Sequence, residues 1–365
     1  MLDGAKVCVN GIDMSATLSD GSHNSKRYVG AGESISIESE APFGAFYVEW
    51  GSVPGEYEVL WESGSMICGQ EGFLHDYVRL PEAVQSLEFV FNDGSAVSVC
   101  ELQPYTMGQA PDDVQDWLPP CAEADMWVFP IHSDDDALFF GALISYYAIE
   151  RGLNVQTAFM VEHRGYPGRD HERLNGLWEM GIRNYPILGK ACDSETWDKN
   201  EAMHIYAPYD ICRWQTELIR RFRPLVVVGH DLNGEYGNGG HKVNAHYLTL
   251  AVDEAADPEK YPESAGIYGV WDTPKLYLHL YEESQVILDV YTPLTNDVQS
   301  RSPFQIAQDA FKHHESQQKW GFRVGGEDKP DYDCRLFGLY RTLVGPDTVN
   351  DIMDNIDADS LRPQK

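Results

Sequence analysis

The chain has 365 residues, of which 58 are Asp or Glu and 27 are Lys or Arg, for a formal net charge of −31. So acidic a chain repels phosphate backbones and anionic lipid headgroups, because both are bound by neutralising negative charge with Lys and Arg. We therefore expect no nucleic-acid partner. The 43% of hydrophobic residues indicate a globular fold, and no apolar run approaches the roughly 20 residues of a membrane-spanning helix.

Seven cysteines, none in a Cys-x-x-Cys pair, argue against a cysteine zinc site and against a dense disulfide framework. The first residues lack the basic and apolar segments of a signal peptide. We expect a cytoplasmic protein, or an exported one whose signal has been removed.

The first part of the chain consists of short β-rich runs between turn signals, such as those at 54–55 and 92–94. Several runs alternate apolar with polar residues, which is typical of an antiparallel sandwich. We predict an all-β jelly-roll or sandwich domain over residues 1–108, a proline-marked linker over 109–123 and a second domain over 124–365. The predicted strands of the first domain are 34–39, 45–50, 57–61, 77–80, 87–91 and 96–100.

From residue 124 onward, strands alternate with amphipathic helices. This pattern predicts an α/β fold with a mainly parallel, Rossmann-like sheet flanked by helices. The predicted strands are 126–131, 155–161, 225–228 and 275–280, and the predicted helices are 137–151, 171–180 and 211–222.

The sharpest motif is His132-Ser133-Asp134-Asp135-Asp136, between the end of a strand and the start of a helix. Open α/β sheets bind ligands at the carboxyl ends of their strands. His132 and Asp135, three residues apart at the turn into a helix, are able to converge on one metal ion, which would need a third ligand. The alternative is an ordinary helix cap, because Ser and Asp are preferred at that position.

A second motif runs from the strand at 225–228 into a glycine-rich loop with the letters GEYGNGGH at residues 234–241. Its His241 is a candidate third ligand, and its Tyr236 a candidate hydroxyl donor. A phosphate cradle is disfavoured, because the loop lacks the Gly-x-x-x-x-Gly-Lys pattern and the net charge is adverse.

Together the two motifs resemble those of the PIG-L, or LmbE-like, family of zinc-dependent N-deacetylases, over about residues 124–320. The resemblance implies a bacterial protein with one Zn²⁺, or another divalent ion, held by His132, Asp135 and His241. It implies that Asp134 is the general base and that Tyr236 polarises the amide oxygen.

The segment Arg169-Asp-His-Glu172 also matches the family, which implies that Arg169 and Glu172 order the substrate. The family has a histidine at the position of Asn238 in this chain. Asn238 is another candidate for contact with substrate. Because this histidine is missing, the resemblance leaves Asp134 as the proton shuttle, helped by His230. His279, on the strand 275–280, is a further candidate for contact with substrate, or equally a packed core histidine.

The resemblance implies a hydrolase that removes the N-acetyl group from an amino-sugar-containing glycan or glycoconjugate. Two alternatives stay open. One is a glycan-binding protein whose deacetylase domain has lost turnover, and the other is an amidase of the same fold acting on a thiol-sugar conjugate.

Aromatic residues offer further contacts with a sugar. The first domain weakly resembles the galactose-binding jelly roll, in which Trp50 or Trp61 would meet glycan, although a purely packing role is as open. In the second domain, the following residues are candidates for sugar stacking or belong to the core: Trp178, Trp197, Trp214, Tyr185 and Tyr209.

Overall fold

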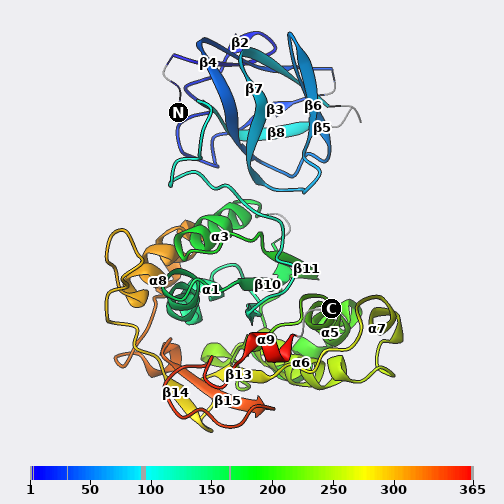
Figure 1. The fold of residues 1–365 in the computed structure, drawn as a ribbon, viewed down its shortest axis with the longest axis vertical. Coiled ribbons are helices and arrows are strands. Elements are labelled where there is room, and N and C mark those ends of the chain that lie inside the picture. Colours follow the sequence, from blue (N-terminus) through cyan, green and yellow to red (C-terminus); the bar gives the residue numbers. More distant parts are fainter. Residues whose placement is uncertain (1, 3, 31, 92–95, 164–165, 363–365) are drawn as a thin grey trace. The chain divides into compact units, whose positions relative to one another are not determined.

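The computed structural model describes residue 2 and residues 4–30, 32–91, 96–163 and 166–362. The turn predicted at 92–94 lies outside them. The chain divides into two compact units, Met1–Pro119 and Pro120–Lys365 (Figure 1). This division falls inside the predicted linker of residues 109–123. The stretch is not all free linker, because Val114 is buried against Tyr47 and Tyr105 of the first unit.

The N-terminal unit is built from antiparallel strands, in the order β2-β1-β4-β7-β5-β6, with β8 paired to both β4 and β3. Register shifts between residues 38 and 45 interrupt the pairing of the long strands β4 and β7. A unit built from antiparallel strands agrees with the all-β prediction, whereas the likeness to a galactose-binding jelly roll stays a prediction. The strands are β1 (Lys6–Val9), β2 (Ile12–Asp13), β3 (Arg27–Val29), β4 (Ile35–Trp50), β5 (Tyr57–Trp61), β6 (Gly64–Cys68), β7 (His75–Val90) and β8 (Val97–Tyr105).

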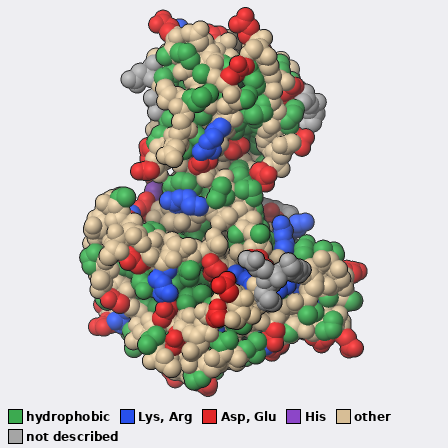
Figure 2. Space-filling model, in the orientation of Figure 1, with side chains coloured by type: hydrophobic (Ala, Val, Ile, Leu, Met, Phe, Trp, Pro, Cys, Tyr) green, Lys and Arg blue, Asp and Glu red, His purple; other side chains and the backbone are tan. Residues whose placement is uncertain are grey.

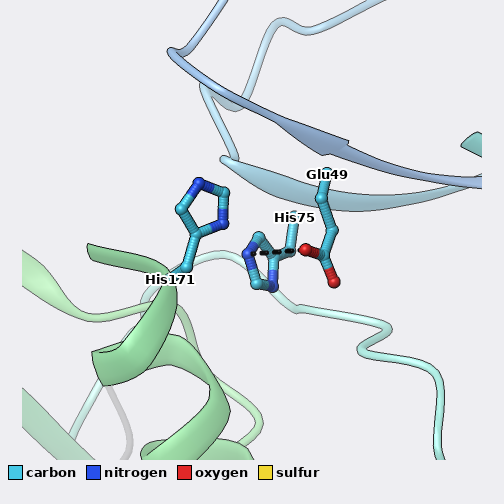
Figure 3. Close-up of side chains that lie close together, drawn as sticks. All are labelled: Glu49, His75 and His171. Atoms are coloured by element: carbon cyan, nitrogen blue, oxygen red, sulfur yellow. Dashed lines mark ion pairs between the residues drawn. The ribbon is translucent and has the colours of Figure 1, made fainter. Parts of the chain in front are cut away.

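The predicted role of Trp50 in glycan binding is wrong, because its side chain is in the core of this unit. Its ring meets those of Tyr57 and Phe89 at centroid distances of 5.2 and 6.3 Å, and only 1% of it is exposed. On the same sheet, Glu49 of β4 is paired in register with His75 of β7, and a carboxylate oxygen of Glu49 lies 3.8 Å from His75 Nε2 (Figure 3). Burial lowers the pKa of His75.

The C-terminal unit contains a mixed sheet in the order β11-β10-β9-β12-β13-β15-β14. The first five of these strands are parallel, and β15 runs antiparallel to both β13 and β14. The α/β prediction is therefore confirmed, with an antiparallel edge added. The strands are β9 (Met126–Val128), β10 (Val155–Glu162), β11 (Ile187–Cys192), β12 (Val226–Gly229), β13 (Lys275–His279), β14 (Gln285–Ile287) and β15 (Leu336–Thr342).

Helices α5 and α6 cover one face of this sheet, where Trp127 and Phe129 of the sheet pack with Ile219 and Leu248. Helices α1, α3 and α8 form a second group (Figure 1). The α-helices are α1 (Asp135–Phe139), α2 (Gly141–Ser145), α3 (Gly168–Glu179), α4 (Lys199–Tyr206), α5 (Ile211–Phe222), α6 (Gly239–Ala256), α7 (Pro262–Tyr268), α8 (Pro303–Lys312) and α9 (Ala358–Leu361). Shorter helical segments are Tyr146–Glu150, Ala207–Tyr209, Glu235–Gly237, Glu315–Trp320 and Pro330–Tyr332.

The single helix predicted at 137–151 is instead three consecutive pieces, because the chain departs from helical angles at Phe140 (φ −115°, ψ −8°) and ends in a π-helical turn. Acidic side chains are spread over the visible face of each unit rather than gathered in one patch (Figure 2). Within the described ranges, no helix is long and apolar enough to cross a membrane.

Candidate metal and active site

The candidate site lies where parallel strands of the C-terminal unit end. The His132 motif follows β9 and leads into α1, while His163 and Asp193 come directly after β10 and β11. His241 lies in the first turn of α6, beyond the end of β12. Because these strands are parallel neighbours, their carboxyl ends bring together residues that are up to 109 positions apart in the sequence.

Three predicted ligands converge at this edge. Asp135 Oδ2 lies 3.3 Å from His132 Nδ1 and 3.2 Å from His241 Nε2, and the two ring nitrogens are 3.1 Å apart. All three side chains are buried or nearly so. The three residues form a group whose donor atoms are able to hold a metal ion.

The donor set and spacing fit zinc. Ligand bonds of about 2.0–2.1 Å around a tetrahedral ion place neighbouring donor atoms about 3.3 Å apart, close to the three distances in this group. Two imidazoles and one carboxylate are also a usual set for catalytic zinc, which keeps a fourth position open. The residues present therefore fit a catalytic divalent ion.

Asp134 and Asp136 flank the ligand Asp135 and have different surroundings. Arg169 Nη2 donates to Asp134 Oδ1 at 2.5 Å. Burial raises the pKa of Asp134, and the Arg169 guanidinium opposes that rise. Asp136 is completely buried and accepts a hydrogen bond from the Ala137 N–H. Only Asp134 of this pair lines the pocket.

Asp193 joins several of these groups, although neither it nor His163 was expected from the sequence. One of its oxygens lies 3.3 Å from His132 Nε2, and the other 3.1 Å from His163 Nδ1. Burial opposes the charge of Asp193, but hydrogen bonds from the two histidines hold its pKa well below the usual range. Burial lowers the pKa of His163 to about 4.

His230 and His279 are not among the residues that line the pocket. The ring of His230 stacks on that of His241 at 4.4 Å, and its Nδ1 lies 3.1 Å from Glu235 Oε1. His279 Nδ1 lies 2.9 Å from both oxygens of the same Glu235. Both histidines are completely buried and each contacts Glu235. The expected help of His230 in proton transfer and the expected contact of His279 with substrate stay predictions.

The loop of the second motif has a constrained backbone. Tyr236 has a left-handed conformation (φ +44°), which is costly for a residue with a side chain. Asn238 caps α6, since its Oδ1 accepts hydrogen bonds from the N–H groups of Gly240 and His241. Tyr236 and Asn238 both line the pocket.

The pocket in front of the ligands has a volume of about 670 Å³ and is lined by charged, polar and aromatic residues. Trp197 and Trp320, in this lining, are 56% and 64% exposed. The rings of Trp197 and Phe322 contact that of Tyr236 at centroid distances of 6.0 and 5.6 Å. The lining residues are His132, Asp134, Glu162, His163, Tyr166, Arg169, Cys192, Asp193, Glu195, Trp197, Tyr236, Asn238, Ser316, Gln317, Lys319, Trp320 and Phe322.

Some predicted contacts with substrate lie outside this lining. Glu172 acts one step behind it, accepting hydrogen bonds from the N–H and hydroxyl of the lining residue Ser316 at 2.8 and 2.6 Å. Of the five aromatic candidates in this domain, Trp197 lines the pocket, whereas Trp214 packs against Phe129 at 6.2 Å.

Two curated relatives illustrate the similarity of this chain to known proteins. The 1D-myo-inositol 2-acetamido-2-deoxy-alpha-D-glucopyranoside deacetylase 2 of Saccharopolyspora erythraea is 32% identical over 171 residues, covering 40% of this chain and 61% of the relative. A deacetylase 1 with the same substrate name, from Catenulispora acidiphila, is 28% identical over 193 residues, covering 45% and 58%. These relatives are deacetylases by name.

The chain spans about three fifths of the length of these curated relatives. A solved structure, an N,N'-diacetylchitobiose deacetylase from Pyrococcus horikoshii, covers 56% of this chain and is itself covered to 78%, with a TM-score of 0.40 and 16% identity. No family model matches the chain. The names of the relatives agree with the activity class that the family resemblance implies, hydrolysis of an amide.

Proposed function

We propose that the C-terminal unit is a PIG-L-like, metal-dependent hydrolase that cleaves the N-acyl amide of an amino-sugar conjugate. The observation that carries this proposal is the convergence of His132, Asp135 and His241 within 3.3 Å of one another, beside a carboxylate that lines the same pocket. The names of the sequence relatives support the same reaction class.

The metal would be held by His132, Asp135 and His241. When bound there, a divalent ion supplies a Lewis acid and lowers the pKa of a water molecule from about 15.7 towards about 7.

Asp134 is the proton carrier in this proposal. Its carboxylate accepts a proton as water adds to the amide carbonyl carbon, and returns that proton to the nitrogen as the C–N bond breaks, so that a carboxylic acid and an amine leave. Burial, which raises the pKa of Asp134, suits it to both steps, while Arg169 fixes the direction of its carboxyl. The Tyr236 hydroxyl donates a hydrogen bond to the carbonyl oxygen as negative charge develops there.

Asn238 does not replace the family's histidine as an acid, because an amide side chain has no proton to give up at neutral pH. Its Oδ1 is engaged with the start of α6. The proton for the departing amine therefore comes from Asp134 and not from a second residue of this loop.

The pocket suits a small conjugate with a hydroxyl-rich ring. Charged and polar groups in its lining bind hydroxyls, and an exposed indole such as that of Trp197 stacks on the apolar face of a sugar. The relatives are named for an acetamido sugar linked to inositol. An amidase acting on such a conjugate is thus better supported than an enzyme of polymeric glycans.

The test is product release by the metal-loaded chain. We expect free amine and carboxylate from an N-acetylglucosamine linked to a cyclitol, or from the same sugar carrying a larger, thiol-bearing acyl group. Comparison of these two substrates assigns the acyl group. Binding of such a conjugate that survives metal removal, with no amine released from either one, would refute the enzyme and support a binding protein.

A further inference from the structure

We propose that Asp193 is a positioning residue that sets the metal-binding form of His132. The inference rests on the metal site of the proposed function. It concerns a residue in the turn after β11 that no recognised motif includes, 58 positions beyond Asp135 in the sequence.

The metal site determines where the proton of the His132 ring lies. Its Nδ1 faces Asp135 and His241 and must offer a lone pair to a metal. The proton of the neutral ring then sits on Nε2, which lies 3.3 Å from Asp193 Oδ1. A carboxylate that accepts from the far nitrogen of a ligating histidine fixes the tautomer and the ring orientation.

Asp193 is itself held by two neighbouring side chains. Its Oδ2 lies 3.1 Å from His163 Nδ1 and 3.5 Å from Arg169 Nη1. His163 Nε2 accepts from the Ser133 N–H at 3.2 Å, so His163 presents a proton at Nδ1, towards Asp193. Because Ser133 follows the ligand His132, these contacts close a ring around the ligand.

Arg169 links the ligand to the base. Arg169 donates to Asp134 with one terminal nitrogen and approaches Asp193 with the other. Asp193 therefore orients His132 directly and supports the guanidinium that directs Asp134. A purely structural residue would affect the stability of the fold, whereas a residue in this position affects how tightly the site holds a metal.

The experiment measures Zn²⁺ affinity of the full chain, stripped of metal, by competition with a chromogenic chelator. Loss of such an outer partner costs about 10- to 100-fold in metal affinity, so we expect D193A to reach about 100-fold and D193N, which keeps an acceptor oxygen, about tenfold. The matched control is E259Q, which removes an exposed carboxylate of the same unit outside the pocket lining and should stay within about twofold, the small effect of a surface substitution.

Thermal unfolding of the metal-free forms checks the fold, and the shape-conserving D193N keeps the test decisive if D193A does not fold. Wild-type affinity in D193N and D193A, or an equal loss in E259Q, would overturn the role of Asp193 whether or not amine is released. If the variants show the expected order of Zn²⁺ affinities but the chain cleaves no amide, the proposed function is refuted and the positioning role of Asp193 stands.

Discussion

Three adjacent aspartates, Asp134, Asp135 and Asp136, provide the sharpest test of the proposed mechanism, because we expect substitution of each to have a different effect. D134N keeps the oxygen that accepts from Arg169 but loses the proton carrier. General base catalysis is worth about 10²- to 10⁴-fold, or about 3–5 kcal/mol of barrier. We expect turnover to fall by that factor while the bound metal stays at one per chain.

D135N replaces the one anionic donor of the three with a neutral amide, which is a poor metal ligand. We expect metal affinity to fall by more than about 100-fold, the upper end of what losing a ligand's outer partner costs. D136N keeps the acceptor for the Ala137 N–H and lies away from the pocket, so its turnover should remain within about threefold, under about 0.7 kcal/mol.

The assays are metal content after desalting and the rate of amine release under saturating metal. Equal turnover in D134N and the wild type would refute the role of Asp134. A loss in D136N as large as that in D134N would show that charge or packing of the whole motif matters, rather than one positioned carboxylate.

Three further predictions concern binding and stability. W197A should raise KM about two- to tenfold, the worth of one aromatic contact, with kcat nearly unchanged; an unaltered KM would exclude stacking on this indole. R220M should lower the free energy of unfolding by about 3–5 kcal/mol in denaturant titrations, because the buried guanidinium of Arg220 donates to five backbone carbonyls. As a control, R221M at the exposed neighbouring position should change this free energy by less than about 0.5 kcal/mol. Hydrogen bonds from His313 and Arg301 lower the pKa of Glu179 to about 2. The carboxylate therefore contributes about 1–2 kcal/mol to the free energy of unfolding above its ordinary pKa, and this contribution is lost as pH falls from about 5 to 2. E179Q should flatten that part of the profile of stability against pH, and an unchanged profile would contradict the assignment.

Local patterns predicted the elements that carry a strong period of their own. The helix expected at 211–222 is α5 over the same residues, because its buried positions recur at helical spacing, with Pro224 following two residues after its end. The buried strands β9, β10, β12 and β13 were likewise predicted from their apolar runs. The antiparallel β15 was not, since its place in the sheet depends on pairing with β13, about 60 residues earlier.

The ligands could be predicted because His132, Asp135 and His241 belong to two compact motifs. Asp193 could not, because it follows a short edge strand, β11, whose sequence alternates weakly. The sequence also could not rank the histidines after β12, because only the fold shows His230 turned towards Glu235. The rule that ligands gather at strand ends would have pointed to His163, directly after β10.

The C-terminal unit is closed by its own two ends. Arg362, after α9, donates to the backbone oxygens of Ala124 and Arg223 and lies 3.2 Å from the carboxylate of Asp125, just before β9. Residues 124 and 362 of this unit therefore lie side by side. We therefore expect a circular permutation that joins residues 362 and 124 through a short linker to leave the metal site in place, because that site lies at the opposite ends of the strands.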